Sequence, residues 1–211
     1  MKRMLLLSSV RFLMKNQLNI FGRSFLNFKM AFITTASKGV VDKTYLERDK
    51  KFFSEQRMDF EEIDLDDYKN KGTELLDKLR DFELVFLEGG NTYYLIKSIR
   101  ESGFDKVIRE LLSKGVVYSG ASAGVCVACP SIEMVTWNHP DKYNYYGVKD
   151  FVGMNLIPFL ISGHYKPEYK DLLQEKMKWT RYPVKVLTDD QAILVEGDKY
   201  TFVGNQEEIK F

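Results

Sequence analysis

A short stretch of small residues, Gly120-Ala121-Ser122-Ala123-Gly124, most constrains the fold of this chain. It follows an apolar run that begins at Val116 and is typical of a buried strand. Glycine at both flanks allows the backbone to turn sharply and a following helix to pack closely on the strand. The stretch therefore predicts a strand that ends in a tight turn and continues as a helix.

The serine in this turn allows two interpretations. In a Gly-x-Ser-x-Gly turn the hydroxyl is held exposed at the strand end, and the first N–H groups of the helix point at the reaction centre. The structural alternative is a helix N-cap, in which Ser122 only accepts a backbone hydrogen bond. A role for Ser122 as nucleophile requires a base, an acid and oxyanion donors elsewhere in the chain.

Short apolar runs alternate with longer amphipathic stretches along the rest of the chain. Strands are expected over residues 4–7, 30–34, 60–63, 84–87, 116–119 and 159–162, with an antiparallel set over 184–187, 192–195 and 200–203. Helices are expected over residues 43–56, 67–79, 92–101, 105–113 and 168–179. The alternation predicts one α/β domain over residues 1–211, with a mostly parallel sheet, helices on both faces and a C-terminal antiparallel β segment.

The charges of the chain are almost balanced, with 31 Lys and Arg against 30 Asp and Glu. No bulk field attracts nucleic acid or an anionic membrane, so neither is expected as a partner. The N-terminal apolar run is too short for a signal sequence, and two cysteines, Cys126 and Cys129, provide no disulfide framework. These features predict a cytoplasmic protein in which the two cysteines pack inside a helix rather than form a redox pair.

A second glycine turn, Gly89-Gly90, follows the expected strand at residues 84–87. Parallel strands that end at one edge of a sheet converge on one crevice. The backbone N–H of this turn and that of Ala123 would then form a two-donor oxyanion hole beside Ser122. The alternatives are a simple helix cap or a phosphate cradle, but the glycine and lysine spacing of phosphate-binding loops is absent.

The chain contains two histidines that could serve as the base, His139 and His164. His164 directly follows the expected strand at residues 159–162, which places it at a strand end as Ser122 is. His139 lies in a polar loop, where a solvent-exposed role is the simpler explanation. His164 is therefore the predicted base.

The acid that orients the imidazole is expected in the irregular segment between residues 131 and 155. Glu133 ranks first, because it lies just before an apolar pair that favours partial burial. Asp141, in a Pro-Asp-Lys turn, is the alternative. For each of them the structural interpretation is a solvated loop charge.

Four segments give the chain a resemblance to a known family. They are Glu88-Gly89-Gly90-Asn91-Thr92, Gly120-Ala121-Ser122-Ala123-Gly124, Cys129-Pro130-Ser131-Ile132 and Gly163-His164-Tyr165. With them the chain resembles, over most of its length, the dipeptidase E and cyanophycinase family of serine peptidases. The fold of that family is similar to the class I glutamine amidotransferase domain, a flavodoxin-like arrangement.

The resemblance implies roles for particular residues. Ser122 would be the nucleophile, His164 the base, and the N–H groups of Gly90 and Ala123 the oxyanion donors. Some relatives use glutamate as the acid, which favours Glu133. Aspartyl-specific members carry an arginine downstream of the histidine, whereas this chain has lysines there and no arginine until position 181, so a preference for N-terminal aspartate is not expected.

The residues and the resemblance together predict a serine peptidase that cleaves small peptides through an acyl-enzyme. No metal or cofactor is expected, and the protein should be a monomer or a homodimer. Two other functions remain consistent with the residues: a catalytically silent amidotransferase-like domain that binds a metabolite or a partner, and an esterase or amidase that acts on non-peptide acyl groups.

Overall fold

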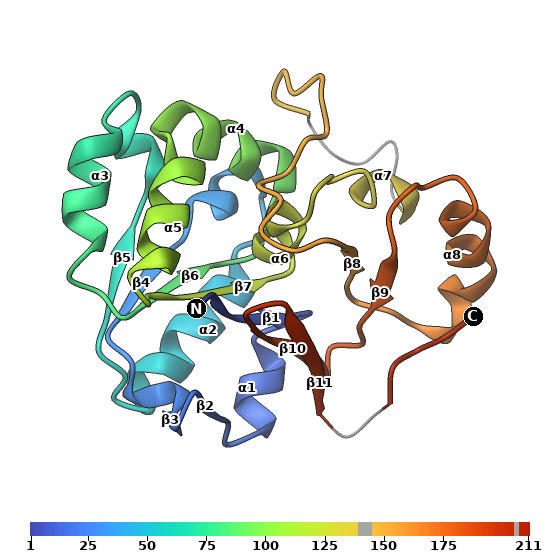
Figure 1. Ribbon diagram of the computed structural model, residues 1–211, viewed down its shortest axis with the longest axis horizontal. Helices are drawn as coiled ribbons and strands as arrows, with labels where there is room; N and C mark the ends of the chain where they lie inside the picture. The colour runs from blue at the N-terminus through green and yellow to red at the C-terminus, as the bar shows by residue number, and fades with distance from the viewer. Residues whose placement is uncertain (139–144, 205–206) are drawn as a thin grey trace.

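A seven-stranded sheet forms the framework of the computed structural model, which describes residues 1–138, 145–204 and 207–211 (Figure 1). The strand order is β11-β10-β1-β7-β6-β4-β5. The strands are β1 (Arg3–Leu7), β4 (Met30–Ile33), β5 (Phe60–Ile63), β6 (Leu84–Leu87), β7 (Val117–Ala121), β10 (Gln191–Glu196) and β11 (Lys199–Gly204). The neighbouring strands β1, β7, β6, β4 and β5 are parallel to one another. β10 pairs antiparallel with both β1 and β11. The predicted α/β class is confirmed.

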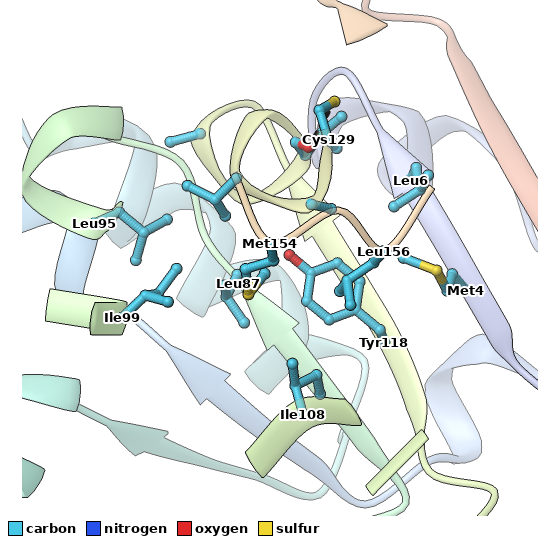
Figure 2. Packing of buried hydrophobic residues seen from close by; sticks show 14 of the residues in the cluster. Met4, Leu6, Leu87, Leu95, Ile99, Ile108, Tyr118, Cys129, Met154 and Leu156 are labelled. Carbon is cyan, nitrogen blue, oxygen red and sulfur yellow. Dashed lines mark hydrogen bonds between the residues drawn. The ribbon is translucent and has the colours of Figure 1, made fainter. Parts of the chain in front are cut away.

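Helices cover both faces of this sheet because the strand side chains alternate between two apolar layers. One layer packs on α1 and α2, and the other on α3 to α6 (Figure 1). Figure 2 shows part of the second layer, where Leu87 and Tyr118 lie among residues of α4 and α5. The helices are α1 (Arg11–Lys15), α2 (Thr44–Glu55), α3 (Gly72–Leu79), α4 (Thr92–Ser102), α5 (Phe104–Ser113), α6 (Ala123–Ala128), α7 (Val135–Asn138) and α8 (Lys170–Met177).

Some expected elements have different bounds or partners in the structure. The helix expected from residue 67 begins at Gly72, because a short 3-10 helix, η3 (Leu65–Tyr68), and a left-handed Asn70 at φ 58° precede it. The other 3-10 helices are η1 (Phe25–Asn27), η2 (Thr35–Gly39) and η4 (Pro167–Tyr169). The structure also contains a two-stranded antiparallel hairpin that was not predicted from the sequence, formed by β2 (Asn19–Ile20) and β3 (Arg23–Ser24).

The expectation of an antiparallel strand over residues 184–187 is wrong. β9 (Val184–Val186) instead pairs in parallel with β8 (Leu160–Ser162), and the two form a small sheet of their own. Parallel neighbours require a crossover of a dozen residues or more, and the segment that contains α8 supplies it. Apolar periodicity in the sequence predicts a half-buried strand, but it does not predict which strand is the pairing partner or whether the pair is parallel.

The turn at residues 120–124 brings α6 into direct contact with the sheet. A Cβ atom added at Gly124 would lie 2.1 Å from the carbonyl oxygen of Leu87, and one at Gly120 would lie 2.7 Å from the carbonyl carbon of Gly124. The Tyr118 hydroxyl donates a hydrogen bond to the Gly124 carbonyl across the same contact, at 2.5 Å. Glycine at both flanks is therefore a packing requirement of this turn.

Substitution of Gly124 tests this requirement. We expect Gly124→Ala to lower the free energy of unfolding by about 1–3 kcal/mol, because the new methyl group must displace α6 from β6. Urea unfolding followed by circular dichroism measures the change. Gly72→Ala is the control, since its Cβ would lie 3.5 Å from the nearest atom, the carbonyl oxygen of Ser102. Equal stability of the two variants would contradict the packing argument.

The parallel strands β1, β4, β6 and β7 end at one edge of the sheet, and the turns after β6 and β7 contain Gly89-Gly90 and Ser122, which were singled out in the sequence. In open α/β sheets ligands bind at this edge. Within the described residues, no helix has both the length and the apolar character needed to cross a membrane.

Candidate active site

Ser122 occupies the turn between β7 and α6 in a strained backbone conformation. Its φ of 51° lies in the left-handed region, which non-glycine residues rarely adopt. The Ser122 N–H donates to the carbonyl oxygen of Leu7 at 3.2 Å, and its own carbonyl accepts from the first turn of α6. The strand β1 and the helix α6 thus hold this conformation, which presents the side chain at the sheet edge.

The structure brings His164 to Ser122. His164 follows β8 after Gly163, and its Nε2 atom lies 2.9 Å from Ser122 Oγ. The His164 N–H donates to Ser8 Oγ at 2.7 Å, and the next N–H, of Tyr165, donates to the Leu187 carbonyl at 3.0 Å. Backbone contacts to β1 and to the end of β9 therefore fix where the imidazole lies.

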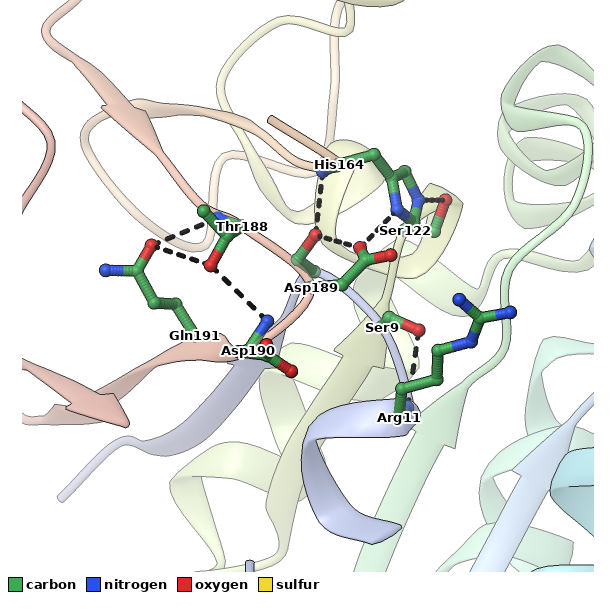
Figure 3. Close-up of polar contacts among 9 residues, drawn as sticks. Ser9, Arg11, Ser122, His164, Thr188, Asp189, Asp190 and Gln191 are labelled. Atoms are coloured by element: carbon green, nitrogen blue, oxygen red, sulfur yellow. Dashed lines mark hydrogen bonds and ion pairs between the residues drawn. The ribbon is translucent and has the colours of Figure 1, made fainter. Parts of the chain in front are cut away.

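Asp189 completes a chain of three side chains. Its Oδ1 atom lies 2.6 Å from His164 Nδ1, on the side of the imidazole away from Ser122 (Figure 3). The hydrogen bond from His164 lowers the pKa of Asp189 below its ordinary value, and the charges of His164 and Arg11 act in the same direction against the effect of burial. The carboxylate is thus ionised at neutral pH and accepts the Nδ1–H proton, which leaves Nε2 to face Ser122.

Glu133 does not occupy this position, which corrects the sequence-based choice of acid. Its Oε2 atom accepts a hydrogen bond from Ser131 Oγ at 3.0 Å, and its N–H donates to the same oxygen at 3.1 Å. These two bonds close a local turn after α6 and direct the carboxylate to Ser131 rather than to His164. The alternative acid, Asp141, and the other histidine, His139, lie outside the described residues.

Two polar residues of the site were missed by the sequence analysis, Asp189 and Ser8. The Ser8 hydroxyl donates to Asp189 Oδ1 at 3.0 Å while it accepts the His164 N–H, so it links Asp189 to the backbone of His164. Ser8 directly follows β1, and Asp189 lies three residues after the last residue of β9. A polar residue at or near the end of an apolar strand was the sequence signal that could have identified Ser8 and Asp189.

The expected oxyanion donors are the N–H groups of Ala123, which is next to Ser122 in the chain, and of Gly90, which lines the same two cavities as Ser122. Ala123 follows it at the start of α6, and a Cβ atom added at Gly89 would lie 3.2 Å from Ser122 Cβ. Gly90 has φ 141°, and a Cβ there would lie 2.4 Å from the Ala36 carbonyl oxygen, so only glycine fits. Among the described residues, the N–H groups of Gly90 and Ala123 have no acceptor.

Two cavities flank Ser122, and both also border His164 and Asp189. The larger, about 390 Å³, has an apolar wall from α6 and α7, and it also borders Lys166 and Tyr169. The smaller, about 310 Å³, extends toward α2. Its polar lining consists of Arg11, Tyr45, Arg48, Asp49 and Glu88, together with residues it shares with the larger cavity. The site can therefore hold a small molecule on each side of the Ser122 hydroxyl.

A buried carboxyl group, that of Glu88, lies at the base of the glycine turn. Glu88 is 2% exposed, and its Oε1 atom accepts the Gly89 N–H at 2.6 Å. Within the described part of the chain its Oε2 atom has no hydrogen-bond partner. Burial, together with the negative charge of Asp49, raises the pKa of Glu88 to about 8. Glu88 is therefore mostly protonated at neutral pH.

This raised pKa predicts a pH-dependent stability. The folded chain keeps the Glu88 proton up to about pH 8, whereas the ordinary value is 4.5, so the folded state binds more protons between these limits. The contribution of Glu88 to stability is then fully present below pH 4.5 and is lost as the pH rises to about 8. In this range we expect the free energy of unfolding of wild type to fall more steeply than that of Glu88→Gln, by roughly 1 kcal/mol per pH unit.

Chemical denaturation at pH 5, 6, 7 and 8 measures this slope. Asp49, whose pKa burial raises to about 6, is present in both proteins and contributes equally to each. Glu55→Gln is the control, because Glu55 lies on the exposed face of α2. If wild type and Glu88→Gln have parallel slopes, Glu88 is not a buried, protonated acid.

The two cysteines behave as packing residues. Both belong to the α6 segment and its C-terminal end, and both are free thiols. Burial raises the pKa of Cys126 to about 12 and that of Cys129 well above its ordinary value, so neither is a thiolate at neutral pH. Cys126 also borders the larger cavity. Across the described ranges, no cluster of three or more metal-ligating side chains is found.

A serine, an imidazole and a carboxylate in one hydrogen-bonded chain, at the edge of a parallel sheet, define the site as that of a serine hydrolase. The comparison with known proteins agrees with this class. Residues 4–203 match the model of Peptidase family S51, and the chain belongs to that family. It is therefore a serine-type peptidase, and the resemblance to the dipeptidase E family is confirmed.

Individual relatives cover most of the chain. An uncharacterized peptidase of Pasteurella multocida is 29% identical over 185 residues, which is 86% of this chain and 87% of that one. Peptidase E of a Nostoc species is 31% identical over 170 residues, 78% of this chain and 66% of that one. A crystal structure from Listeria monocytogenes, provisionally named as a peptidase E protein, superposes with a TM-score of 0.81 at 25% identity, over 98% of this chain and 100% of that one.

Proposed function

We propose that this peptidase hydrolyses short peptides through Ser122 as nucleophile, His164 as general base and acid, and Asp189 as the residue that orients His164. The observation that carries the proposal is the pair of contacts at the imidazole, 2.9 Å from Nε2 to Ser122 Oγ and 2.6 Å from Nδ1 to Asp189 Oδ1. A binding domain without activity would not need both contacts at one strained turn.

The reaction follows from these contacts. His164 Nε2 takes the hydroxyl proton as Ser122 Oγ forms a bond to the peptide carbonyl carbon. The C–N bond then breaks, and the amine leaves with the proton from His164. A water molecule attacks the resulting acyl-enzyme while His164 removes a proton from it. The ester bond breaks, the carboxylic acid leaves, and the proton on His164 returns to the Ser122 oxygen.

The negative charge on the carbonyl oxygen needs hydrogen-bond donors during both steps. The N–H groups of Gly90 and Ala123 are the proposed donors, because they lie beside Ser122 and have no acceptor among the described residues. Such donors, fixed before the reaction begins, lower the barrier without any reorganisation of the site. The start of α6 adds to this effect only modestly, because the helix is short.

The dimensions and lining of the two cavities favour small substrates. Cavities of about 390 and 310 Å³ accommodate one or two residues on each side of the cleaved bond. The larger cavity has a lysine, Lys166, and no arginine in its lining. Arg181 instead places its guanidinium 4.9 Å from the ring centre of Tyr182. Arg11 and Arg48 line only the smaller cavity, so the larger cavity has no arginine clamp for an N-terminal aspartate, which supports a substrate range that is not restricted to this residue. The cytoplasmic location and the oligomeric state remain predictions.

Labelling with a fluorophosphonate tests the proposed nucleophile. We expect a covalent adduct on Ser122 in the wild-type protein, no adduct in Ser122→Ala, and a steep decrease in His164→Ala. Intact-mass and peptide mass spectrometry locate the adduct. A panel of dipeptides, esters and amides then identifies the preferred acyl substrate. A native protein that resists labelling and hydrolyses none of these compounds would favour a silent binding domain.

The choice of acid is tested by a matched pair of variants. We expect Asp189→Asn to lower kcat roughly 10⁴-fold, because the amide no longer selects the Nδ1–H tautomer. Glu133→Gln should change kcat less than about threefold, since its carboxylate contacts Ser131. The same pair can be compared by fluorophosphonate labelling rate. The opposite order of effects would restore Glu133 as the acid.

Ser8 is expected to support the acid. Ser8→Ala removes the bond to Asp189 and leaves the His164 N–H without its acceptor, so kcat should fall about tenfold. Ser119→Ala is the control, because Ser119 is a buried serine whose hydroxyl donates to the Leu5 carbonyl at 2.8 Å, away from the imidazole. Both variants should lose some stability, but only Ser8→Ala should lose activity. Equal kcat values would show that Asp189 needs no support from Ser8.

A further inference from the structure

The glycine turn after β6 is held by hydrogen bonds at three of the four backbone N–H groups of residues 88 to 91. The Glu88 N–H donates to the Ile33 carbonyl at 3.0 Å, the Gly89 N–H to Glu88 Oε1 at 2.6 Å, and the Asn91 N–H to the Ala36 carbonyl at 3.0 Å. Of the four N–H groups from residue 88 to residue 91, the structure leaves only that of Gly90 without an acceptor in its described part. The turn is therefore built to expose this one donor.

The carbonyl group of the same turn has a partner from a different helix. The Tyr45 hydroxyl, on the first turn of α2, lies 2.9 Å from the Gly89 carbonyl oxygen. A carbonyl oxygen can only accept, so the phenol donates. Burial raises the pKa of Tyr45, which keeps the phenol protonated and able to donate over the whole physiological range.

Because the peptide bond is planar, the hydrogen bond from Tyr45 to the Gly89 carbonyl also determines the direction of the Gly90 N–H. The Gly89–Gly90 peptide is trans, so its C=O and N–H bonds point in opposite directions. Tyr45 reaches the carbonyl from α2, whose buried residues belong to one layer of the core, whereas those of α6 belong to the layer on the other face. The N–H of Gly90 consequently points away from α2, toward the side where α6 begins after Ser122.

We propose that Tyr45 is a positioning residue of the oxyanion hole: its hydroxyl holds the Gly89 carbonyl and thereby keeps the Gly90 N–H directed at the oxygen that becomes charged during acylation. This inference rests on the proposed function. Glycine has unusual freedom to rotate, so two adjacent glycines require an external contact to hold one peptide orientation. Glu88, which lines the same cavity as Tyr45, holds the preceding peptide of the turn through the Gly89 N–H.

Tyr45→Phe tests the inference because it removes only the hydroxyl. Complete loss of one oxyanion donor costs about 10²–10³ in rate, and a donor that is loosened rather than removed should lose part of this, about tenfold. We expect the maximal rate of fluorophosphonate labelling and the kcat for the best dipeptide to fall about tenfold. The inhibitor KI and the substrate KM should change less than about twofold, since the ring that lines the cavity remains.

Tyr94→Phe is the matched control. The Tyr94 hydroxyl donates to Asp66 Oδ2 at 2.7 Å, so this variant also loses one partly buried tyrosine hydrogen bond, but away from Ser122. Thermal unfolding should show similar small losses of stability in the two variants. Only Tyr45→Phe should have a lower labelling rate, and a purely structural role for Tyr45 would not produce this difference.

The outcomes separate this inference from the proposed function. If Ser122 is labelled in the wild-type protein but Tyr45→Phe reacts at the wild-type rate, the inference is wrong and the triad stands. If Tyr45→Phe raises KI and KM alone, Tyr45 is a wall of the binding cavity and the inference is also wrong. If the wild-type protein is neither labelled at Ser122 nor hydrolytic, the proposed function fails and takes the inference with it.

Discussion

The contact between α6 and the end of β6 determines the geometry of the whole site. Gly124 packs against the Leu87 carbonyl at a distance that admits no side chain, and this contact fixes where the helix after Ser122 begins. The same strand, β6, continues directly into the glycine turn. Two turns from neighbouring strands are thereby held next to each other, with a hydroxyl on one and a free N–H on the other. Side-chain chemistry at this edge depends on a backbone contact that contains no catalytic atom.

The electrostatics of the site follow from the same close packing. Glu88 is too deeply buried to be charged at neutral pH, and in its protonated form it still accepts the Gly89 N–H. Asp189, in contrast, is held ionised by the hydrogen bond from His164. Two carboxyl groups of one site therefore differ in protonation because one is surrounded by apolar strands and the other by donors. Neutral Glu88 therefore adds no second negative charge to the cavity that it lines together with Asp189.

The sequence predicted the parts of this structure that depend on local pattern. The parallel strands, the tight turn at Ser122, and the position of His164 at a strand end follow from apolar periodicity and from small residues at fixed spacing. The acid could not be found in this way, because Asp189 contacts His164 across 25 positions of sequence and through the pairing of β8 with β9. Glu133 was favoured by the apolar pair that follows it and by the glutamate of some relatives, but its carboxylate accepts a hydrogen bond from the nearby Ser131. The pairing of β8 with β9 determines which carboxylate reaches His164, and such long-range pairing cannot be inferred from a single sequence.

The division of the site between two sheets has a consequence for how such a chain can change. Ser122 and the glycine turn belong to the seven-stranded sheet, whereas His164 and Asp189 follow the two strands of the small sheet. Parallel pairing of β8 with β9 fixes both ends of the segment between them but not its length, so the residues on either side of the buried Leu173 of α8 are where this connection can vary. Insertions or deletions there would reshape the rim above Lys166 and Tyr169 without separating the histidine from its aspartate. New substrate ranges could thus arise in one surface segment while the reacting groups keep their spacing.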